Sequence, residues 1–241
     1  RAAVNAEHHP MASRRRRARF REFEGFPKEL FSFLRRLKKN NERAWFQAHK
    51  SEYEAHVKAP LEAFVREAEP ELGRGKMFRI YRDVRFSKDK SPYKTAATAV
   101  FESRGCVYYL HLEPRSFFTA TGCYQMAKDQ RQRFYEAVVD ARKGRKLETL
   151  VEEMEGAGYE VGGEALKTAA RGYPKDHERV RFLRHKGLTV SMNWKPLPAW
   201  LNGPDAGPKL MESYRDARPL NGWLEKHVGP SEETRHRYVK D

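Results

Sequence analysis

The chain has 241 residues, a length that favours one large domain or two closely packed ones. Hydrophobic residues make up 39% of the sequence and charged residues 34%, while 12% aromatic residues supply the large side chains that a disordered chain lacks. We therefore expect a folded, very polar and soluble protein. No apolar run approaches the ~18 residues of a membrane span, and none follows the N-terminal arginines, so we expect neither membrane insertion nor classical secretion.

The two cysteines are too few for a disulfide framework, and no CxxC or His-x-x-x-His spacing suggests zinc. This cysteine usage is typical of a reducing compartment. We expect a cytoplasmic protein with no metal and no other cofactor.

The net charge of +15 is concentrated in two segments. Residues 1–21 contain seven arginines and one glutamate, and residues 74–94 contain eight lysines or arginines against Asp83 and Asp89, so each segment carries a net +6. An acidic partner would meet these two segments.

Residues 1–21 show no apolar periodicity that could pack on a core, so we expect a flexible basic arm there. We expect a single domain at residues 22–228 and a flexible polar tail at residues 229–241. Such an arm binds nucleic-acid phosphates through counterion release. A solvated tail is the alternative interpretation, and a mitochondrial presequence is a third, weakened by Glu7 and by the lack of an amphipathic face.

Helices are the first predicted elements of the domain. Apolar residues recur at helical spacing from Leu30 to Leu37, and Asn40-Asn41 ends this run. We expect Asn41 to cap a second helix, whose apolar positions continue to Val65. Pro60 lies within this second helix and should kink or divide it.

Strands are predicted next. Residues 78–86 alternate between mostly apolar and mostly polar side chains, which predicts a half-buried strand. A polar loop at residues 87–92 and a second strand at residues 93–101 follow. Two further strands, at residues 106–112 and 117–124, form a hairpin about the turn at residues 113–116.

The turn of this hairpin predicts a register. If Glu113 faces Ser116, then Cys106 lies opposite Cys123. We expect both thiols to be reduced and buried, behaving as small hydrophobic groups.

The C-terminal half again reads as mostly helical. Apolar stripes predict helical structure from residue 127 to residue 155, ended by Gly156-Ala157-Gly158. After the loop at residues 171–177, we expect a helix near Phe182, a last strand near Val190 and one closing helix at about residues 209–227. This order predicts an α+β fold, in which N-terminal, central and C-terminal helices cover an antiparallel β-sheet.

Several blocks of the sequence resemble one protein family. Residues 78–95, FRIYRDVRFSKDKSPYKT, closely resemble the signature of the bacterial domain of unknown function 2461 family. Supporting blocks follow the same order in both: NNERAWF at 40–46, GEALK at 163–167, RGYPKDH at 171–177 and PLNGWL at 219–224. The resemblance covers about residues 23–228 and implies a single soluble bacterial domain. It brings no activity, cofactor or catalytic residue.

The signature block predicts a site for an anion. On a strand, Arg79, Tyr81, Asp83 and Arg85 would project to one face as a ladder with neighbours ~7 Å apart. Guanidinium groups bind phosphate or carboxylate at two points, and lysines add mobile charge. The alternative is a structural face in which the two aspartates neutralise part of this charge.

The block at residues 171–177 is a second polar cluster. Gly172 and Pro174 shape a tight loop, and His177 beside Asp176 is a conceivable acid–base pair. The structural alternative makes His177 a helix-start residue with Asp176 as its cap. We expect the ligand to be bound by residues of both clusters: Arg79, Tyr81, Arg82, Asp83, Arg85, Lys88, Lys90, Tyr93, Lys94, Arg171, Tyr173, Lys175 and His177.

Other patterns carry little signal. The sequence contains neither a P-loop nor a GxSxG motif. His111 has no ligand spacing and is expected to be a surface or packed residue. Because Tyr108 and Tyr109 alternate on their strand, one of them is a candidate for exposure and for stacking on a base.

We therefore expect an anion-binding domain, most simply for a phosphate-containing ligand. The alternatives are a nucleic-acid-binding module that uses the basic segment and the arm, an enzyme acting on an anionic substrate with Asp83, Tyr93 or His177 moving a proton, and an interaction protein with an acidic partner.

Overall fold

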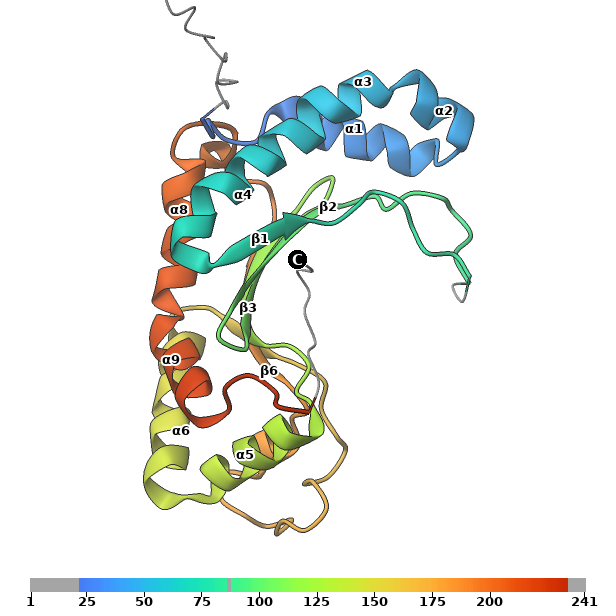
Figure 1. Cartoon of the computed structure of the whole chain (residues 1–241). Coiled ribbons are helices and arrows are strands. Elements are labelled where there is room, and N and C mark those ends of the chain that lie inside the picture. Colours follow the sequence, from blue (N-terminus) through green and yellow to red (C-terminus); the bar gives the residue numbers. More distant parts are fainter. Residues whose placement is uncertain (1–21, 86–87, 234–241) are drawn as a thin grey trace, which may run out of the picture.

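The structure of the protein is a computed structural model, which describes residues 22–85 and 88–233. The expected basic arm therefore lies outside the described residues, as does most of the expected tail. The described part contains a six-stranded antiparallel sheet together with helices from both ends of the chain (Figure 1). The predicted α+β fold is confirmed.

The N-terminal helices follow the predicted periodicity. Helix α1 (Lys28–Lys39) buries its predicted apolar face, and the second predicted helix is divided before Pro60. Its pieces are α2 (Arg43–Ala48), α3 (Lys50–Tyr53), the π-helical turn η1 (Glu54–Lys58) and α4 (Ala59–Leu72). Proline has no N–H to donate to the preceding turn, and the wider π turn lies where that bond is lost.

The strands lie in the order β1-β2-β3-β4-β6-β5. Their bounds are Arg74–Met77 (β1), Ala97–Ser103 (β2), Cys106–Leu112 (β3), Phe117–Cys123 (β4), Glu160–Gly162 (β5) and Leu188–Trp194 (β6). Leu112 pairs with Phe117 and Val107 with Gly122, so the predicted β3–β4 register is confirmed. The thiols of Cys106 and Cys123 are buried and free, with their Sγ atoms 3.8 Å apart.

The prediction of a strand at residues 78–86 is wrong. Strand β1 ends at Met77, and the chain then leaves the sheet as a long loop before β2 begins at Ala97 (Figure 1). The two legs of this loop pair with each other: Arg82 N–H donates to Pro92 O at 2.9 Å, and Lys94 N–H donates to Ile80 O at 2.7 Å. Phe78 N–H still donates to Thr98 O of β2 at 2.9 Å. Beyond Phe78, the alternating pattern reflects the local pairing of the two legs, in which one side of the loop is buried.

The C-terminal helices differ from the prediction at one point. The central helices are α5 (Lys128–Val139) and α6 (Ala141–Gly156), and the short α7 (Val180–Leu183) precedes β6. A 3-10 turn, η2 (Ala199–Asn202), leads to α8 (Ala206–Asp216) and α9 (Arg218–His227), where the sequence predicts one closing helix. Pro219 stands in the first turn of α9 and cannot continue the ladder of α8, so the predicted helix is divided.

All the described helices that build the two large apolar cores lie on one face of the sheet. One core joins α1, α4 and α8 to Tyr108, Leu110 and Leu112, and the other joins α5, α6 and α9 to the two cysteines. Intervening residues of β3, such as Val107 and Tyr109, point to the opposite face. The small cluster on that face contains residues of the strands and of the long loop, and none of a described helix.

Residues 229–233 belong to the segment expected to be a tail, and they contact α5. Asp129 accepts hydrogen bonds from Ser231 Oγ at 2.8 Å and from Glu232 N–H at 2.9 Å. Arg133 Nη2 donates to Pro230 O at 2.8 Å.

Candidate functional site

The long loop at residues 78–96 carries most of the predicted site residues, and internal ion pairs hold several of them. Arg82 Nη1 lies 2.5 Å from Asp89 Oδ2, and Arg85 contacts both oxygens of Asp83, at 3.0 and 2.7 Å. Lys90 Nζ donates to Val84 O at 2.9 Å. Both carboxylates of the segment are therefore engaged by arginines of the same loop.

Tyr93 is an anchor of this loop. Its side chain is buried and stacks on Phe46 with ring centroids 4.2 Å apart, whereas Tyr81 is 49% exposed. The Asn41 side chain donates to Tyr93 O at 2.9 Å and accepts from Tyr93 N–H at 3.1 Å. The predicted role of Asn41 as a helix cap is wrong, because Glu42 occupies the cap position of α2 and the Asn41 amide is used by the loop.

Three other predicted cations of the loop form no ion pair with a described residue: Arg79, Lys88 and Lys94. Lys94 Nζ lies 5.3 Å from the ring centroid of Phe78, and Lys76 Nζ lies 5.7 Å from the same ring. Burial, with Arg79 and Arg82 nearby, lowers the pKa of Lys94. Lys94 thus links the predicted basic segment to Phe78 on the face of the sheet that the described helices leave open.

We call the face of the sheet that the described helices leave open the open face. A hollow of about 450 Å³ lies on it. The strand register places Tyr109 beside Val100 and Ala120, and His111 beside Phe118. Phe78 and Ser191 also line the hollow, and Tyr124 at its rim is 54% exposed. An aromatic floor of this kind on a sheet face that no described helix covers is unusual, because large apolar side chains are normally buried.

A chain of polar contacts crosses the floor. Tyr109 Oη lies 3.2 Å from His111 Nδ1, and His111 Nε2 lies 3.4 Å from Glu113 Oε1. With the ring proton on Nε2, the Tyr109 hydroxyl donates to Nδ1 and the imidazole points its N–H at Glu113. Burial lowers the pKa of His111, and the Glu113 carboxylate opposes this effect. In this arrangement His111, which lines the hollow, is a neutral imidazole that connects the Tyr109 hydroxyl to the Glu113 carboxylate.

This floor was not predicted: His111 is expected from the sequence to be a surface or packed residue, and Phe118 lies within the strand predicted at residues 117–124. The signal was present in the confirmed β3–β4 register, because odd-numbered residues of β3 and even-numbered residues of β4 share one face. What the pattern lacked was the information that no described helix covers that face.

The second predicted cluster lies at the other end of the molecule, beside α5 (Figure 1). The Tyr173 ring packs on Tyr135 with centroids 5.3 Å apart, and Arg171 and Lys175 are exposed. His177 Nδ1 accepts from Arg179 N–H at 3.0 Å, and α7 begins at Val180. The structure does not bring this cluster to the long loop, so the two do not form one pocket.

No group of three or more His, Cys, Asp or Glu side chains among the described residues is arranged to hold a metal ion. None of the helices found in residues 22–85 and 88–233 is long and apolar enough to cross a membrane.

Comparison with known proteins identifies a family. A family model described as "Conserved hypothetical protein (DUF2461)" matches residues 29–223. This span includes the block at residues 78–95 and confirms the resemblance found in the sequence. No curated protein and no solved structure matches the chain.

Proposed function

The chain belongs to the DUF2461 family of conserved hypothetical proteins. From the geometry of this member we propose that the open face binds a phosphate-bearing ligand with a flat ring, of which a nucleotide is the simplest example. The observation that carries the proposal is the aromatic floor bordered by Lys76 and Lys94.

The floor supports recognition of a flat ring. Tyr109, His111 and Phe118 cluster their rings on the open face, with centroids 4.9 Å apart for His111 and Phe118, 5.9 Å for Tyr109 and His111, and 5.7 Å for Tyr109 and Phe118. Stacking on an aromatic side chain contributes ~1–3 kcal/mol per base in nucleic-acid complexes and works for any base. Ser191 adds a hydroxyl at the edge of the hollow, where it can bond ring nitrogens or oxygens.

The border supports recognition of the phosphate. The ammonium groups of Lys76 and Lys94 lie over the ring of Phe78, at the edge of the floor. Lys94 is partly desolvated and close to other cations, as its lowered pKa reflects. A phosphate placed there would relieve the repulsion between these cations, and this relief favours binding.

A second candidate is an enzyme acting on the same ligand, and the contact chain Tyr109–His111–Glu113 favours it. Both ring nitrogens of His111 are engaged, so the imidazole would act as a general base by taking a substrate proton through the Tyr109 hydroxyl. The proton-transfer residues expected from the sequence, Asp83, Tyr93 and His177, do not line this hollow. Any such chemistry therefore rests on His111.

The test is calorimetric titration of the full chain with AMP, adenosine and inorganic phosphate. We expect AMP to bind more tightly than either of its parts, and Phe118→Leu and Lys94→Gln each to weaken AMP binding about fivefold or more. Lys88→Gln is the matched control for Lys94→Gln, since it makes the same change at an exposed residue of the loop, and Tyr81→Leu is a second control that removes an aromatic side chain which is 49% exposed.

The outcomes separate the possibilities. Equal losses in Lys94→Gln and Lys88→Gln would show that only the general positive field acts, and would contradict a defined site. If AMP binds no more tightly than phosphate, the floor does not recognise a ring. Tyr109→Phe keeps the ring and removes the hydroxyl, so it should preserve AMP binding and impair only a proton-transfer reaction.

A further inference from the structure

A second hollow, of about 710 Å³, lies between α1 and the turn at residues 113–116 that joins β3 to β4. We call it the α1 groove. Six cationic side chains line it, against the single carboxylate of Glu113: Arg35, Arg36, Lys38, Lys39, Arg115 and Lys195.

Most of this charge is not neutralised within the described part of the chain. Arg36 is paired with Glu52 and lies over the Trp45 ring. The other five cations make no ion pair with a described residue, and Arg35 Nη1 only donates to Pro114 O at 3.3 Å. The helix dipole accounts for Lys38 and Lys39 in the last turn of α1.

The dipole does not account for the convergence of cations from three elements. Arg115 comes from the β3–β4 turn and Lys195 directly follows β6, yet both line the same groove as the lysines of α1. Bringing like charges together in this way costs free energy unless an anion is bound there.

The α1 groove and the open face are linked through Glu113. Glu113 lines the groove, and its Oε1 lies 3.4 Å from Nε2 of His111, which lines the hollow of the open face. Residues 109, 111 and 113 alternate along one side of the chain at a spacing of ~7 Å, so a strand lying along Tyr109 and His111 would reach the groove at Glu113.

From this link we propose that the ligand is a single-stranded nucleic acid, whose bases stack on the open face and whose phosphates continue into the α1 groove. The inference rests on the proposed function of the open face and extends it. A mononucleotide reaches only the floor and its lysine border. A duplex keeps its bases stacked on each other, so a flat aromatic floor favours an unpaired strand.

The test uses fluorescence anisotropy with a labelled 12-nucleotide single-stranded RNA and the full chain at several salt concentrations. The groove variant carries Arg35→Gln, Lys39→Gln and Arg115→Gln. We expect it to bind the RNA about tenfold or more weakly, and its slope of log affinity against log salt to fall by ~2, since each phosphate contact contributes ~0.7 for a single strand.

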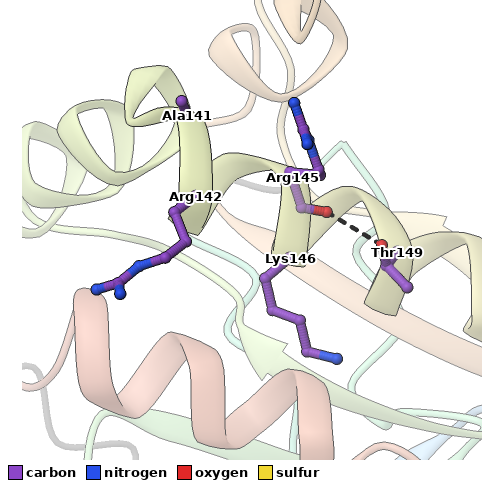
Figure 2. A pocket seen from close by; sticks show the side chains of 5 residues that line it. All are labelled: Ala141, Arg142, Arg145, Lys146 and Thr149. Carbon is purple, nitrogen blue, oxygen red and sulfur yellow. Dashed lines mark hydrogen bonds between the residues drawn. The ribbon is translucent and has the colours of Figure 1, made fainter.

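A matched control is available on α6, where a separate basic hollow is lined by Arg142, Arg145 and Lys146 (Figure 2). Their replacement by glutamine removes the same three charges, two arginines and one lysine, from side chains that are exposed as in the α1 groove. We expect this variant to bind the RNA within about twofold of the unmodified protein. All variants keep the arginine-rich residues 14–19, so their differences report the groove alone. Thermal melting checks that each variant is folded.

Four results would decide the matter. Equal losses in the groove and α6 variants would overturn the inference, because the effect would then be one of net charge. Binding of AMP without binding of RNA would overturn it while leaving the proposed function intact. RNA binding that needs the groove but is unaffected by Phe118→Leu would refute the continuous path. Loss of RNA affinity in both the groove and Phe118→Leu variants, with AMP affinity lowered only by Phe118→Leu, is the expected result.

Discussion

At the scale of single residues, the side-chain amide of Asn41 determines where the long loop between β1 and β2 lies. It forms two hydrogen bonds with the backbone of Tyr93, the same two groups that a neighbouring strand would engage. The buried Tyr93 ring then fixes the loop against Phe46. Because Lys94 follows Tyr93 directly, this anchor also places Lys94 over Phe78 at the border of the open face.

Asn41→Ala should therefore release the loop while the sheet stays folded. Loss of two partly buried hydrogen bonds is expected to lower the free energy of unfolding by ~1–3 kcal/mol. Hydrogen exchange at residues 79–94 should become faster, whereas exchange in β3 and β4 should not change. Asn40→Ala is the matched control, since the Asn40 side chain bonds only the exposed end of α1. Faster exchange in both variants would contradict this role.

At the scale of elements, the junction of α5 and α6 is held by a buried arginine. Arg179 Nε donates to Val138 O at 2.8 Å and Nη2 reaches Val139 O at 3.5 Å, so the guanidinium covers the C-terminal carbonyls of α5. A cation is favourable there, since the helix dipole is negative at that end. Gly144 makes room for it, because a Cβ at this position would lie 2.4 Å from Arg179 Nε and 2.1 Å from Val138 O.

Two glycine substitutions in helices should consequently change the free energy of unfolding in opposite directions. Gly144→Ala is expected to destabilise the protein by ~1–3 kcal/mol, because the new methyl group overpacks the junction and displaces Arg179. Gly222→Ala, in α9, adds a Cβ with no atom within 4 Å and should stabilise by ~0.5–1 kcal/mol through helix propensity. Denaturant titration measures both. A stabilising Gly144→Ala would show that Arg179 is not held as described.

At the scale of the whole molecule, the shifted pKa values predict how stability depends on pH. Burial lowers the pKa of His111 and of His185 below the ordinary value of 6.5. The unfolded chain then binds more protons than the folded one just below pH 6.5, so the free energy of unfolding falls as the pH falls. The carboxylates act in a lower pH range. The hydrogen bond from Arg215 lowers the pKa of Glu71, and the hydrogen bond from Arg85 lowers the pKa of Asp83 to about 2. These two carboxylates therefore lose their contribution to the free energy of unfolding only below their ordinary pKa values of 4.5 and 3.8.

The melting temperature should therefore decrease between pH 7.5 and pH 5.5. The double variant His111→Gln/His185→Gln should show a weaker dependence over this range, because it retains every carboxylate and lacks two of the three imidazoles, those of His111, His185 and His227, whose pKa burial lowers. A melting temperature that stays constant or rises on acidification of the unmodified protein would be inconsistent with these buried neutral histidines. An unchanged dependence in the double variant would assign the effect to other groups.

Local patterns in the sequence were sufficient for the elements whose partners are close in the chain. The apolar face of α1, the division at Pro60 and the register of the β3–β4 hairpin depend on helical spacing, on the missing proline N–H and on a four-residue turn, and all are confirmed. The strand expected at residues 78–86 failed because alternation shows that one side of a segment is buried without showing what buries it. Here the loop is buried on itself and on Phe46, through Tyr93.

The family, the α+β class and the concentration of positive charge are evident before any folding is considered, since these follow from local blocks and patterns in the chain. Which charges remain without a partner among the described residues, and what lies beside them, depends on the fold. Arg82 and Arg85 are paired within their loop, while Lys94 meets an aromatic floor whose residues come from β3 and β4. Four cations of the α1 groove lie together at residues 35–39, and Arg115 and Lys195 join them only because the sheet brings the β3–β4 turn and the end of β6 beside α1. The physical reason is that side-chain electrostatics and stacking act over a few ångströms in space, whatever the separation of the residues along the chain.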